Sequence, residues 1–525
     1  MSSMLRGVVT VGVWTMASRV LGFARDMLIA AMLGAGPVAD AFFVALKLPN
    51  LFRRLFGEGA FNAAFVPSFT GMLQAEGKEA ANRFAEEAAS VMAFWLGGLT
   101  IAGMVFMPQV MLVLAPGFSA NPEKFDLAVN LTRITFPYLF LICLTALFSG
   151  VLNGLDRFAA AAAAPVLFNV FSIAAMLGLT PYVANAGYAL AWGVSVSGVA
   201  QLALLVWAVR RAGMRIRIPR PRLTPQMHEL FRKMAPGLVG AGVTQLNLAV
   251  DVIIASLLPP GTVALLYYAD RIQQLPLGVI GTAVGTALLP MLARQVRAGE
   301  AEGAITTLNR ALEFALFLTV PAALALAISA FPIVWVLFGR GAFDMEAARL
   351  SAQALAAYAL GLPAFVAVKV LAPAFFARGD TAKPVKIGMS AVALNLALNV
   401  AFMVPLRHIG PALATSIAAI FNCVWLAWVL HKQGQLVPDA GLLHRLPRMG
   451  LAAAAMAATL ALAQGPLFAI APGVRGVKYV ALAALVSLGL GAYVLAGQLT
   501  GAFDLREVRA LLRRPRRKAA PGTIG

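Results

Sequence analysis

The amino-acid sequence predicts an all-α polytopic membrane protein with about fourteen transmembrane helices, in two six-helix lobes in pseudo-twofold arrangement plus two C-terminal helices. Its composition, its apolar runs and an internal repeat support this prediction. Hydrophobic residues make up 60% of the 525 residues, charged residues make up 12%, and the mean hydropathy is +0.82. A soluble domain carries about 25% charged residues, so the composition excludes one. The long unbroken apolar runs exclude a transmembrane barrel, whose strands alternate polar and apolar residues over ~10 positions.

Apolar runs of about 20 residues, separated by glycine, proline and charged residues, predict where the helices lie. In the first half we expect helices near residues 8–33, 38–56 with a continuation to Phe69, 84–114, 129–152, 160–180 and 187–209. In the second half we expect them near residues 234–257, 263–292, 308–338, 350–376, 386–404 and 410–430. Two further helices are expected near residues 449–471 and 477–499.

Several short patterns recur between the two halves of the chain at a nearly constant spacing. Gly-Tyr-Ala-Leu-Ala at 187–191 returns as Gly-Pro-Ala-Leu-Ala at 410–414, and Asn169 corresponds to Asn395. A repeat in the same membrane orientation implies two bundles related by an axis along the membrane normal, with the substrate between them. The predicted domains are an N-terminal lobe over 1–215, a C-terminal lobe over 216–434, a C-terminal helix pair over 435–500 and a basic tail over 501–525.

Basic residues gather on alternate loops, as is typical of loops on the cytoplasmic side of a membrane. Arginine and lysine are frequent between 210 and 233 and in the tail, whereas the loops at 34–37 and 259–262 have none; Lys124 is one of the exceptions. We therefore expect both termini in the cytoplasm. Topology and contact with anionic membrane lipids then explain the net charge of +20, and no nucleic-acid partner is expected.

Charged side chains interrupt the first two predicted helices, where a charge at bilayer depth costs at least ~2.5 kcal/mol and should face a polar interior. Cations outnumber acids there, and the planar fork of arginine suits bidentate binding of phosphate. The pattern predicts a cavity that binds an anionic phosphate or diphosphate substrate. The candidate residues are Arg19, Arg25, Asp26, Asp40, Lys47, Arg53 and Arg271. The alternative is that the charges form ion pairs that hold helices together.

Helix geometry predicts the directions in which the charged side chains of the first helix point. Arg19 and Asp26 share one face, whereas Arg25 points to another side unless the helix bends at Gly22. Under the ion-pair alternative, Asp26 and Arg25 are candidate partners.

A smaller polar set lies in the second half of the chain. It consists of Asp251 in the seventh predicted helix, Asn395 and Asn399 on one face of the eleventh, and Thr415 in the twelfth. Oxygen ligands of this kind could hold a hard monovalent cation, so the set is a candidate sodium site. Hydrogen bonding between helices is the alternative, and the sequence favours neither.

Four long stretches resemble the MurJ (MviN) family of lipid II flippases, in the multidrug/oligosaccharidyl-lipid/polysaccharide (MOP) exporter superfamily. They are SRVLGFARD at 18–26, DAFFVALKLPNLFRRLFGEGAFNAAFVPSF at 40–69, YYADRIQQLPLGVIGTAVGTALLP at 267–290 and KVLAPAFFARGDTAKPVKI at 369–387. The resemblance covers nearly the whole chain. It implies two lobes around a cationic cavity, a groove for a lipid tail along the last two helices, and a place in the bacterial cytoplasmic (inner) membrane. The implied activity is alternating-access transport of lipid II, the undecaprenyl-diphosphate-linked peptidoglycan precursor, from the inner to the outer leaflet.

The resemblance also implies roles for individual residues. The functional arginines of the family fall on Arg19, Arg25, Arg53 and Arg271, and its cavity acids fall on Asp26 and Asp40. Some relatives have a glutamate where this chain has Gln274, so any role of that carboxylate is lost here or has moved to another residue. Some also bind sodium through residues that correspond to the Asp251 set, but Asn399 replaces an acid found in some of them.

Two other functions remain open on the sequence: a flippase for a different undecaprenyl-linked glycan, and a MATE-like cation antiporter. An antiporter for cationic drugs should favour acidic and aromatic residues, and this predicted cavity is cationic. Catalysis is not expected, because no histidine lies in a predicted span and no acidic metal-binding cluster is present. We expect a monomer with no catalytic residues and no cofactor apart from the candidate sodium ion.

Overall fold

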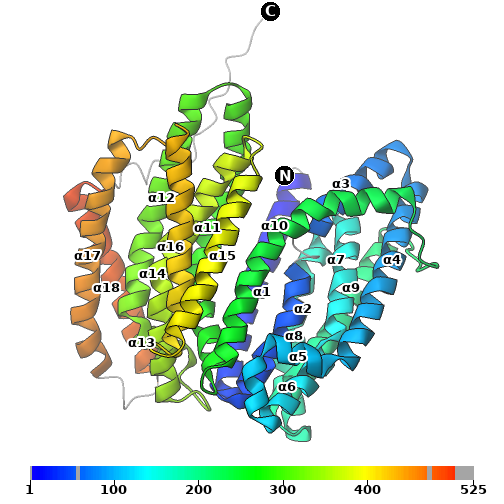
Figure 1. The fold of residues 1–525 in the computed structure, drawn as a ribbon, viewed down its shortest axis with the longest axis horizontal. Helices are drawn as coiled ribbons and strands as arrows, with labels where there is room; N and C mark the ends of the chain where they lie inside the picture. Colours follow the sequence, from blue (N-terminus) through cyan, green and yellow to red (C-terminus); the bar gives the residue numbers. More distant parts are fainter. Residues whose placement is uncertain (1–2, 55–59, 470–475, 503–525) are drawn as a thin grey trace, which may run out of the picture. The chain divides into compact units, whose positions relative to one another are not determined.

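The computed structural model of the chain describes residues 3–54, 60–469 and 476–502. Within these ranges every regular element is a helix, which confirms the all-α prediction (Figure 1). Most of the predicted tail lies outside the described residues. So do residues 55–59, on which the predicted continuation of the second helix towards Phe69 depends.

Helices overlap every apolar run that the sequence predicts to be helical. The first half contains α1 (Ser3–Leu33), α2 (Pro37–Phe52), α3 (Ala60–Ala75), α4 (Lys78–Val105), α5 (Met107–Leu114), η2 (Pro116–Ala120), α6 (Pro122–Thr135), α7 (Pro137–Gly154), α8 (Phe158–Leu179), η3 (Thr180–Tyr182) and α9 (Ala186–Arg211). The second half contains α10 (Pro225–Ser256), α11 (Thr262–Arg297), α12 (Ala301–Ile328), α13 (Ala330–Phe338), α14 (Met345–Phe376), α15 (Ala382–Phe402), α16 (Ile409–Lys432), α17 (Ala440–Ala469) and α18 (Val477–Thr500).

Three predicted helices are each divided into two, giving the pairs α4–α5, α6–α7 and α12–α13. Every second member of these pairs has a proline in its first turn, namely Pro108, Pro137 and Pro332. Proline has no N–H to bond to a preceding turn but fits the start of a helix, so a new helix begins there. Hydropathy alone does not reveal these breaks, because the residues on both sides are apolar.

Ten helical stretches of the described chain are long and apolar enough to cross a membrane. One of them, Pro122–Gly154, joins α6 and α7. The helices α1 and α11, which carry predicted anion-binding residues, are not among the ten. The structure is therefore that of a multi-helix membrane protein, and the predicted total of fourteen spans stays a prediction.

The chain forms two compact units. The first consists of Met1–Ile272, Leu337–Ala354 and Val385–Ala418, and the second consists of Gln273–Val336, Leu355–Pro384 and Ala419–Gly525. Segments from both predicted lobes contribute to the first unit, which also contains all the candidate site residues.

Helix packing in the first unit centres on α7, α8 and α9. Helix α8 packs against α1 and α9, α7 packs against α3, α4 and α9, and α2 packs against α6 (Figure 1). Along α3, the rings of Phe61, Phe65 and Phe69 stack at four-residue spacing and are buried. Aromatic pairs at this spacing lie on one face of a helix, which here is the face turned to the core.

The turn between α1 and α2 is held in the first unit by hydrogen bonds to its backbone carbonyls. The amide of Ala342 donates to the carbonyl of Ala31 at 2.8 Å, and the hydroxyl of Tyr268 donates to the carbonyl of Gly34 at 3.0 Å. Gly34 and Gly261 have φ values of +64° and +95°, and each faces a backbone carbonyl so closely that a Cβ would clash. Both positions therefore require glycine for its backbone conformation and for its missing side chain.

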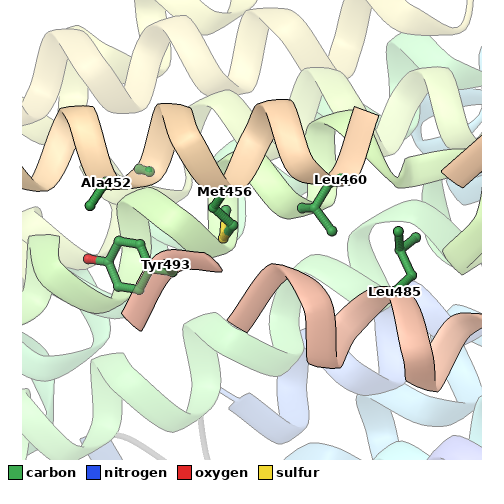
Figure 2. Close-up of a cluster of buried hydrophobic side chains, with 6 residues drawn as sticks. Ala452, Met456, Leu460, Leu485 and Tyr493 are labelled. Atoms are coloured by element: carbon green, nitrogen blue, oxygen red, sulfur yellow. The ribbon is translucent and has the colours of Figure 1, made fainter. Parts of the chain in front are cut away.

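In the second unit, α17 packs against α12 and α18. Figure 2 shows the apolar cluster between them, in which Met456 and Leu460 of α17 face Leu485 and Tyr493 of α18. The hydroxyl of Tyr493 donates to the carbonyl of Phe317 in α12 at 2.8 Å. The predicted pair of C-terminal helices is thus attached to α12 by an apolar interface and by the part-buried hydrogen bond of Tyr493.

Candidate functional site

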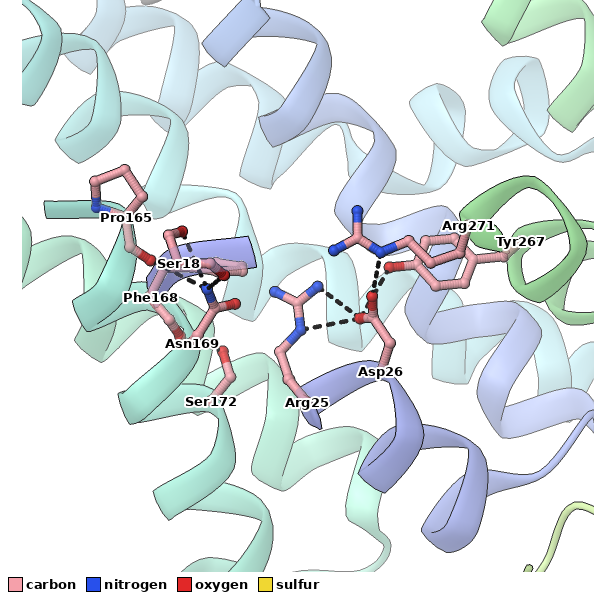
Figure 3. A network of polar contacts seen from close by, with 9 residues as sticks. All are labelled: Ser18, Arg25, Asp26, Pro165, Phe168, Asn169, Ser172, Tyr267 and Arg271. Carbon is pink, nitrogen blue, oxygen red and sulfur yellow. Dashed lines mark hydrogen bonds and ion pairs between the residues drawn. The ribbon is translucent and has the colours of Figure 1, made fainter. Parts of the chain in front are cut away.

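The carboxylate of Asp26 lies between two arginines in the first unit (Figure 3). Its Oδ1 accepts from Arg25 Nη2 at 2.7 Å and Nε at 3.2 Å, and its Oδ2 lies 2.5 Å from Arg271 Nε. The hydroxyl of Tyr267 donates to Oδ1 at 3.3 Å. These four residues, from α1 and α11, are called the Asp26 cluster below. The structure corrects the helical expectation for α1, because Arg25 reaches Asp26 although α1 continues unbroken through Gly22.

Burial differs between the members of the Asp26 cluster. The Asp26 side chain is 0% exposed and that of Arg25 is 10% exposed, whereas Arg271 keeps 29% exposure. The guanidinium of Arg25 rests on the ring of Phe168, 5.0 Å from its centroid. Asp26 therefore fixes both arginines, and Arg271 is the member that an incoming ligand can reach most easily.

The cluster keeps hydrogen-bond donors for a ligand. Asp26 engages Nε and Nη2 of Arg25 but only Nε of Arg271. Within the described residues, neither terminal amino group of Arg271 has a hydrogen-bond partner, and two arginines with one carboxylate leave one net positive charge. Paired guanidinium N–H groups bind phosphate or carboxylate oxygens strongly. The arrangement can therefore bind an anion without losing its internal ion pairs.

Three other predicted residues lie apart from the Asp26 cluster. Arg19 is exposed on α1, Lys47 is half-buried within electrostatic range of Asp270 and Asp251, and Arg53 donates to Asn50 at 3.4 Å. In the described part of the chain none of the three bonds to a member of the cluster. The prediction that all the cations converge on one anion stays a prediction for Arg19, Lys47 and Arg53.

Asp40 has a different environment from Asp26. Its carboxylate is 1% exposed and accepts from Lys124 Nζ at 2.6 Å and from the backbone amides of Gly261 at 2.6 Å and Ala264 at 2.9 Å. Both oxygens are engaged, and the two amides belong to the start of α11, where unpaired N–H groups and the helix dipole favour a negative charge. We call this arrangement the Asp40 cap. Its geometry supports a role in joining helices rather than in binding a diphosphate.

The residues of the candidate sodium site do meet in the first unit. Asp251 Oδ1 accepts from Asn395 Nδ2 at 3.0 Å and Asn399 Nδ2 at 3.3 Å, and Thr415 Oγ1 lies 3.2 Å from Asp251 Oδ2. This is the interhelical hydrogen-bond network that the sequence left as the alternative. Carboxylate, hydroxyl and amide oxygens suit a hard cation. Among the described residues Asn399 Oδ1 is buried without a partner, so rotation of the amides would supply the required oxygens.

Sequence reasoning missed two residues of these networks. Tyr267 lies four residues before Arg271 on one face of α11, a spacing that could have identified it. In the sequence Lys124 is an exception to the basic-loop pattern; in the structure it is 6% exposed and its ammonium lies 4.0 Å from the centroid of the Phe118 ring. Nothing in the local sequence around Lys124 indicates its distant partner.

Known proteins match this chain over nearly its whole length. The family described as "Lipid II flippase MurJ" matches residues 29–470. A probable lipid II flippase MurJ from Rhizobium tropici is 42% identical over 98% of this chain and 97% of its own length. A probable lipid II flippase MurJ from Rhizobium meliloti is 43% identical over 98% of this chain and 97% of its own length.

Solved structures show the same fold. A lipid II flippase MurJ in an inward closed conformation has a TM-score of 0.78 at 23% identity and covers 96% of this chain and 100% of its own. An inward-facing multidrug resistance MATE family transporter of the MOP superfamily has a TM-score of 0.68 at 14% identity, covering 80% of this chain and 96% of its own. The family match over most of the sequence and the near full-length relatives show that this chain belongs to the MurJ family of lipid II flippases.

Proposed function

We propose that this chain translocates lipid II from the inner to the outer leaflet of the bacterial cytoplasmic membrane by alternating access, without making or breaking a covalent bond. Membership of the MurJ family supports the substrate. The observation that carries the proposal within the molecule is the Asp26 cluster, which presents free guanidinium N–H groups around a buried counter-ion. An undecaprenyl diphosphate headgroup is the anion that such groups fit.

The cluster can bind the diphosphate in a defined way. Arg271 offers its two terminal amino groups to one phosphate, and Arg25 offers Nη1 to the same or the neighbouring phosphate. Asp26 acts as a positioning residue, because it holds both guanidinium groups in place before the ligand arrives. Arg19, Lys47 and Arg53 are proposed to attract the headgroup or to gate its path.

The Asp40 cap is proposed to close one end of the transport path. It joins α2 and α6 to the start of α11 in the first unit, next to the tight turn between α1 and α2. Alternating access requires one end to be sealed while the other is open. The cap should therefore break and re-form once in each cycle.

The membrane arrangement remains part of the proposal. We propose fourteen spans in two lobes, 1–215 and 216–434, with both termini in the cytoplasm. The prenyl tail would lie along α17 and α18, and the protein would work as a monomer.

We also propose that a sodium ion binds at Asp251. Asp251, Asn395, Asn399 and Thr415 supply oxygen atoms from three helices, and the unpartnered Oδ1 of Asn399 favours an ion there. The Asp251→Asn variant should lose any sodium dependence of translocation. Translocation by the unaltered chain at the same rate in sodium and in potassium buffers would contradict this part of the proposal.

The main test is translocation of lipid II in vesicles of defined composition that contain the purified chain. Hydrogen bonds to charged groups contribute about 1.5–3 kcal/mol, so Arg271→Ala and Arg25→Ala should each weaken lipid II binding roughly 10–100-fold. Arg271→Lys should also impair binding, because an ammonium cannot engage two oxygens in the same plane. Arg294→Ala is the matched control: it removes an exposed arginine of the same helix that, among the described residues, bonds only to a local carbonyl. Normal translocation by the Arg25 and Arg271 variants would refute the diphosphate assignment.

Two alternatives share the fold. The MATE structures resemble this chain, so a cation antiporter is the second candidate, and it should exchange a cationic drug against sodium or protons. The net positive charge of the Asp26 cluster disfavours it. A flippase for another undecaprenyl-linked glycan would translocate that glycan lipid faster than lipid II in the same vesicles.

A further inference from the structure

Tyr267 of α11 contacts the Asp26 cluster through its hydroxyl and α2 through its ring. The hydroxyl donates to Asp26 Oδ1 at 3.3 Å (Figure 3). The ring lies face to face with that of Phe43 in α2, with the centroids 3.8 Å apart and the planes at 21°. Phe43 is 1% exposed, so it cannot move aside without disturbing the close packing around α2. One side chain therefore connects the carboxylate of the cluster with α2.

The stack of Phe43 on Tyr267 lies one turn from the Asp40 cap. Asp40 precedes Phe43 by three residues on α2. On α11, Ala264 donates its amide N–H to Asp40 and precedes Tyr267 by three residues. Residues three apart are neighbours on the surface of a helix. The cap and the stack thus join the same two helices at adjacent positions, and a movement that separates α2 from the start of α11 must break both.

The hydroxyl of Tyr267 affects how strongly Asp26 holds the arginines. Among the described residues, the donors to Asp26 Oδ1 are this hydroxyl and two N–H groups of Arg25. If the hydroxyl leaves, less of the negative charge of the carboxylate is neutralised. Asp26 then attracts the guanidinium groups more strongly and repels an incoming anion more strongly. The hydroxyl in its place therefore favours anion binding by the cluster.

We propose that Tyr267 is a positioning residue that couples the diphosphate affinity of the Asp26 cluster to the state of the Asp40 cap. With the cap closed, the stack holds the hydroxyl on Asp26 and the cluster binds the diphosphate tightly. When the cap opens, Phe43 withdraws from Tyr267, the hydroxyl leaves Asp26 and the affinity falls. The inference rests on the proposed transport of lipid II and adds a link between binding and release.

The coupling also acts in the reverse direction. If the closed cap raises the affinity of the cluster for diphosphate, bound diphosphate must favour the closed cap by the same factor. In the proposed orientation the loops at 34–37 and 259–262 face the outside, so the cap beside them closes the outer end. The diphosphate is then bound tightly while that end is shut and loosely once it opens, which favours release to the outer leaflet.

The first test measures binding of undecaprenyl diphosphate to the full-length chain in nanodiscs. Tyr267→Phe keeps the ring on Phe43 but removes the hydroxyl, and it should weaken binding about threefold to tenfold, as expected for one lost hydrogen bond. Tyr268→Phe is the matched control, because it removes the hydroxyl of the next residue, which donates to the carbonyl of Gly34. Its affinity should stay within about twofold of that of the unaltered chain. An unchanged affinity of Tyr267→Phe would overturn the proposal.

The second test asks whether the hydroxyl acts through the stack. Phe43→Leu keeps the hydroxyl of Tyr267 but removes the ring that supports it, so it should weaken binding about as much as Tyr267→Phe does. In the Tyr267→Phe background, Phe43→Leu should weaken binding by less than about twofold, because the hydroxyl is already absent. Effects of the two exchanges that multiply in the double variant would overturn the coupling.

The third test measures opening of the cap itself. Ala264 is 0% exposed, and its amide is bound to Asp40. A thiol introduced by Ala264→Cys should therefore react with a maleimide only while the cap is open, once the native thiols are removed by Cys143→Ala and Cys423→Ala. Saturating undecaprenyl diphosphate should slow the reaction about threefold to tenfold, the same factor as in the binding test, and should slow it less than about twofold when Tyr267→Phe is added. Equal slowing by the ligand with and without Tyr267→Phe would show a merely structural role and overturn the proposal.

Failure of the proposed function would give a different result. If Arg271→Ala binds undecaprenyl diphosphate as tightly as the unaltered chain, the cluster is not the diphosphate site, and the proposed substrate contact fails together with this inference. If Arg271→Ala weakens binding and Tyr267→Phe does not, the diphosphate site stands and only the role of Tyr267 is refuted.

Discussion

Replacing Asp40 with alanine should strongly destabilise the fold, because it breaks a buried ion pair. The Lys124 side chain is 5% exposed and its ammonium lies 2.6 Å from the Asp40 carboxylate. Without Asp40, that ammonium stays buried without its counter-ion, and the amides of Gly261 and Ala264 lose their acceptor. Breaking a buried pair by removal of one partner costs about 3–5 kcal/mol.

Removal of both charges should cost less than removal of one. In the double variant Asp40→Asn with Lys124→Met, the amide oxygen of Asn can still accept from one N–H at the start of α11. The Met side chain can occupy the space above Phe118. We expect the double variant to lose about 1–2 kcal/mol, which corresponds to one or two lost hydrogen bonds.

The free energy of unfolding can be measured by denaturant titration in micelles of one composition for the unaltered chain, both single variants and the double variant. A thermodynamic cycle built from the four values gives the coupling energy of the pair. Lipid II translocation by the same proteins then shows whether the cap also matters for transport. An Asp40→Ala chain as stable as the unaltered one, or a double variant less stable than Asp40→Ala, would refute the reasoning.

Three further predictions concern stability in the second unit. Gly489→Ala should lower the free energy of unfolding by about 1–3 kcal/mol, because the new methyl group would lie 2.8 Å from Leu460 and overpack the interface. An unfolding free energy at or above that of the unaltered chain would contradict the α17–α18 interface. Glu313→Gln should lower the free energy of unfolding by about 1.5–3 kcal/mol, because the Glu313 carboxylate forms ion pairs with Arg310 of α12 and Arg445 of α17. An unchanged free energy of unfolding in the same titration would show that these ion pairs are not formed. Asp380 lies in the loop before α15, and its hydrogen bonds to Lys383 lower its pKa below the ordinary value. The stabilisation from Asp380 should therefore be complete above about pH 4 and should fall as the pH drops through the lowered pKa. Asp380→Ala should remove about 0.5–1 kcal/mol at neutral pH and abolish this acid-dependent part, and a pH profile identical to that of the unaltered chain would refute the assignment.

Sequence reasoning succeeded where the signal is periodic or extreme. Apolar runs of the right length predict the helices because hydropathy reports burial in lipid or core. A buried charge in such a run is costly enough to predict a polar environment, and Arg25, Asp26 and Arg271 do meet. The helices and the need for a polar environment follow from local composition.

The failures have a common physical origin. The helical wheel describes the direction of a Cβ, and it separated Arg25 from Asp26 because it ignores the reach of a long side chain. The role of Asp40 as a cavity acid stays a prediction; two of its partners are backbone amides more than 200 positions away, which no charge pattern encodes. Helix α1 continues unbroken through Gly22, where an added Cβ would lie 3.1 Å from Arg271 Nη2.

The carboxylate that two arginines share in the Asp26 cluster has an electrical consequence. The empty cluster carries one net positive charge, and a diphosphate brings about one negative charge on each phosphate. The net charge of the cluster is therefore positive in its empty form and negative in its loaded form, with the diphosphate bound. A membrane potential that is negative inside acts on them in opposite directions, at about 2.3 kcal/mol per charge and 100 mV for full passage across the membrane. In the proposed cycle the same voltage drives the loaded cluster outward and draws the empty one back.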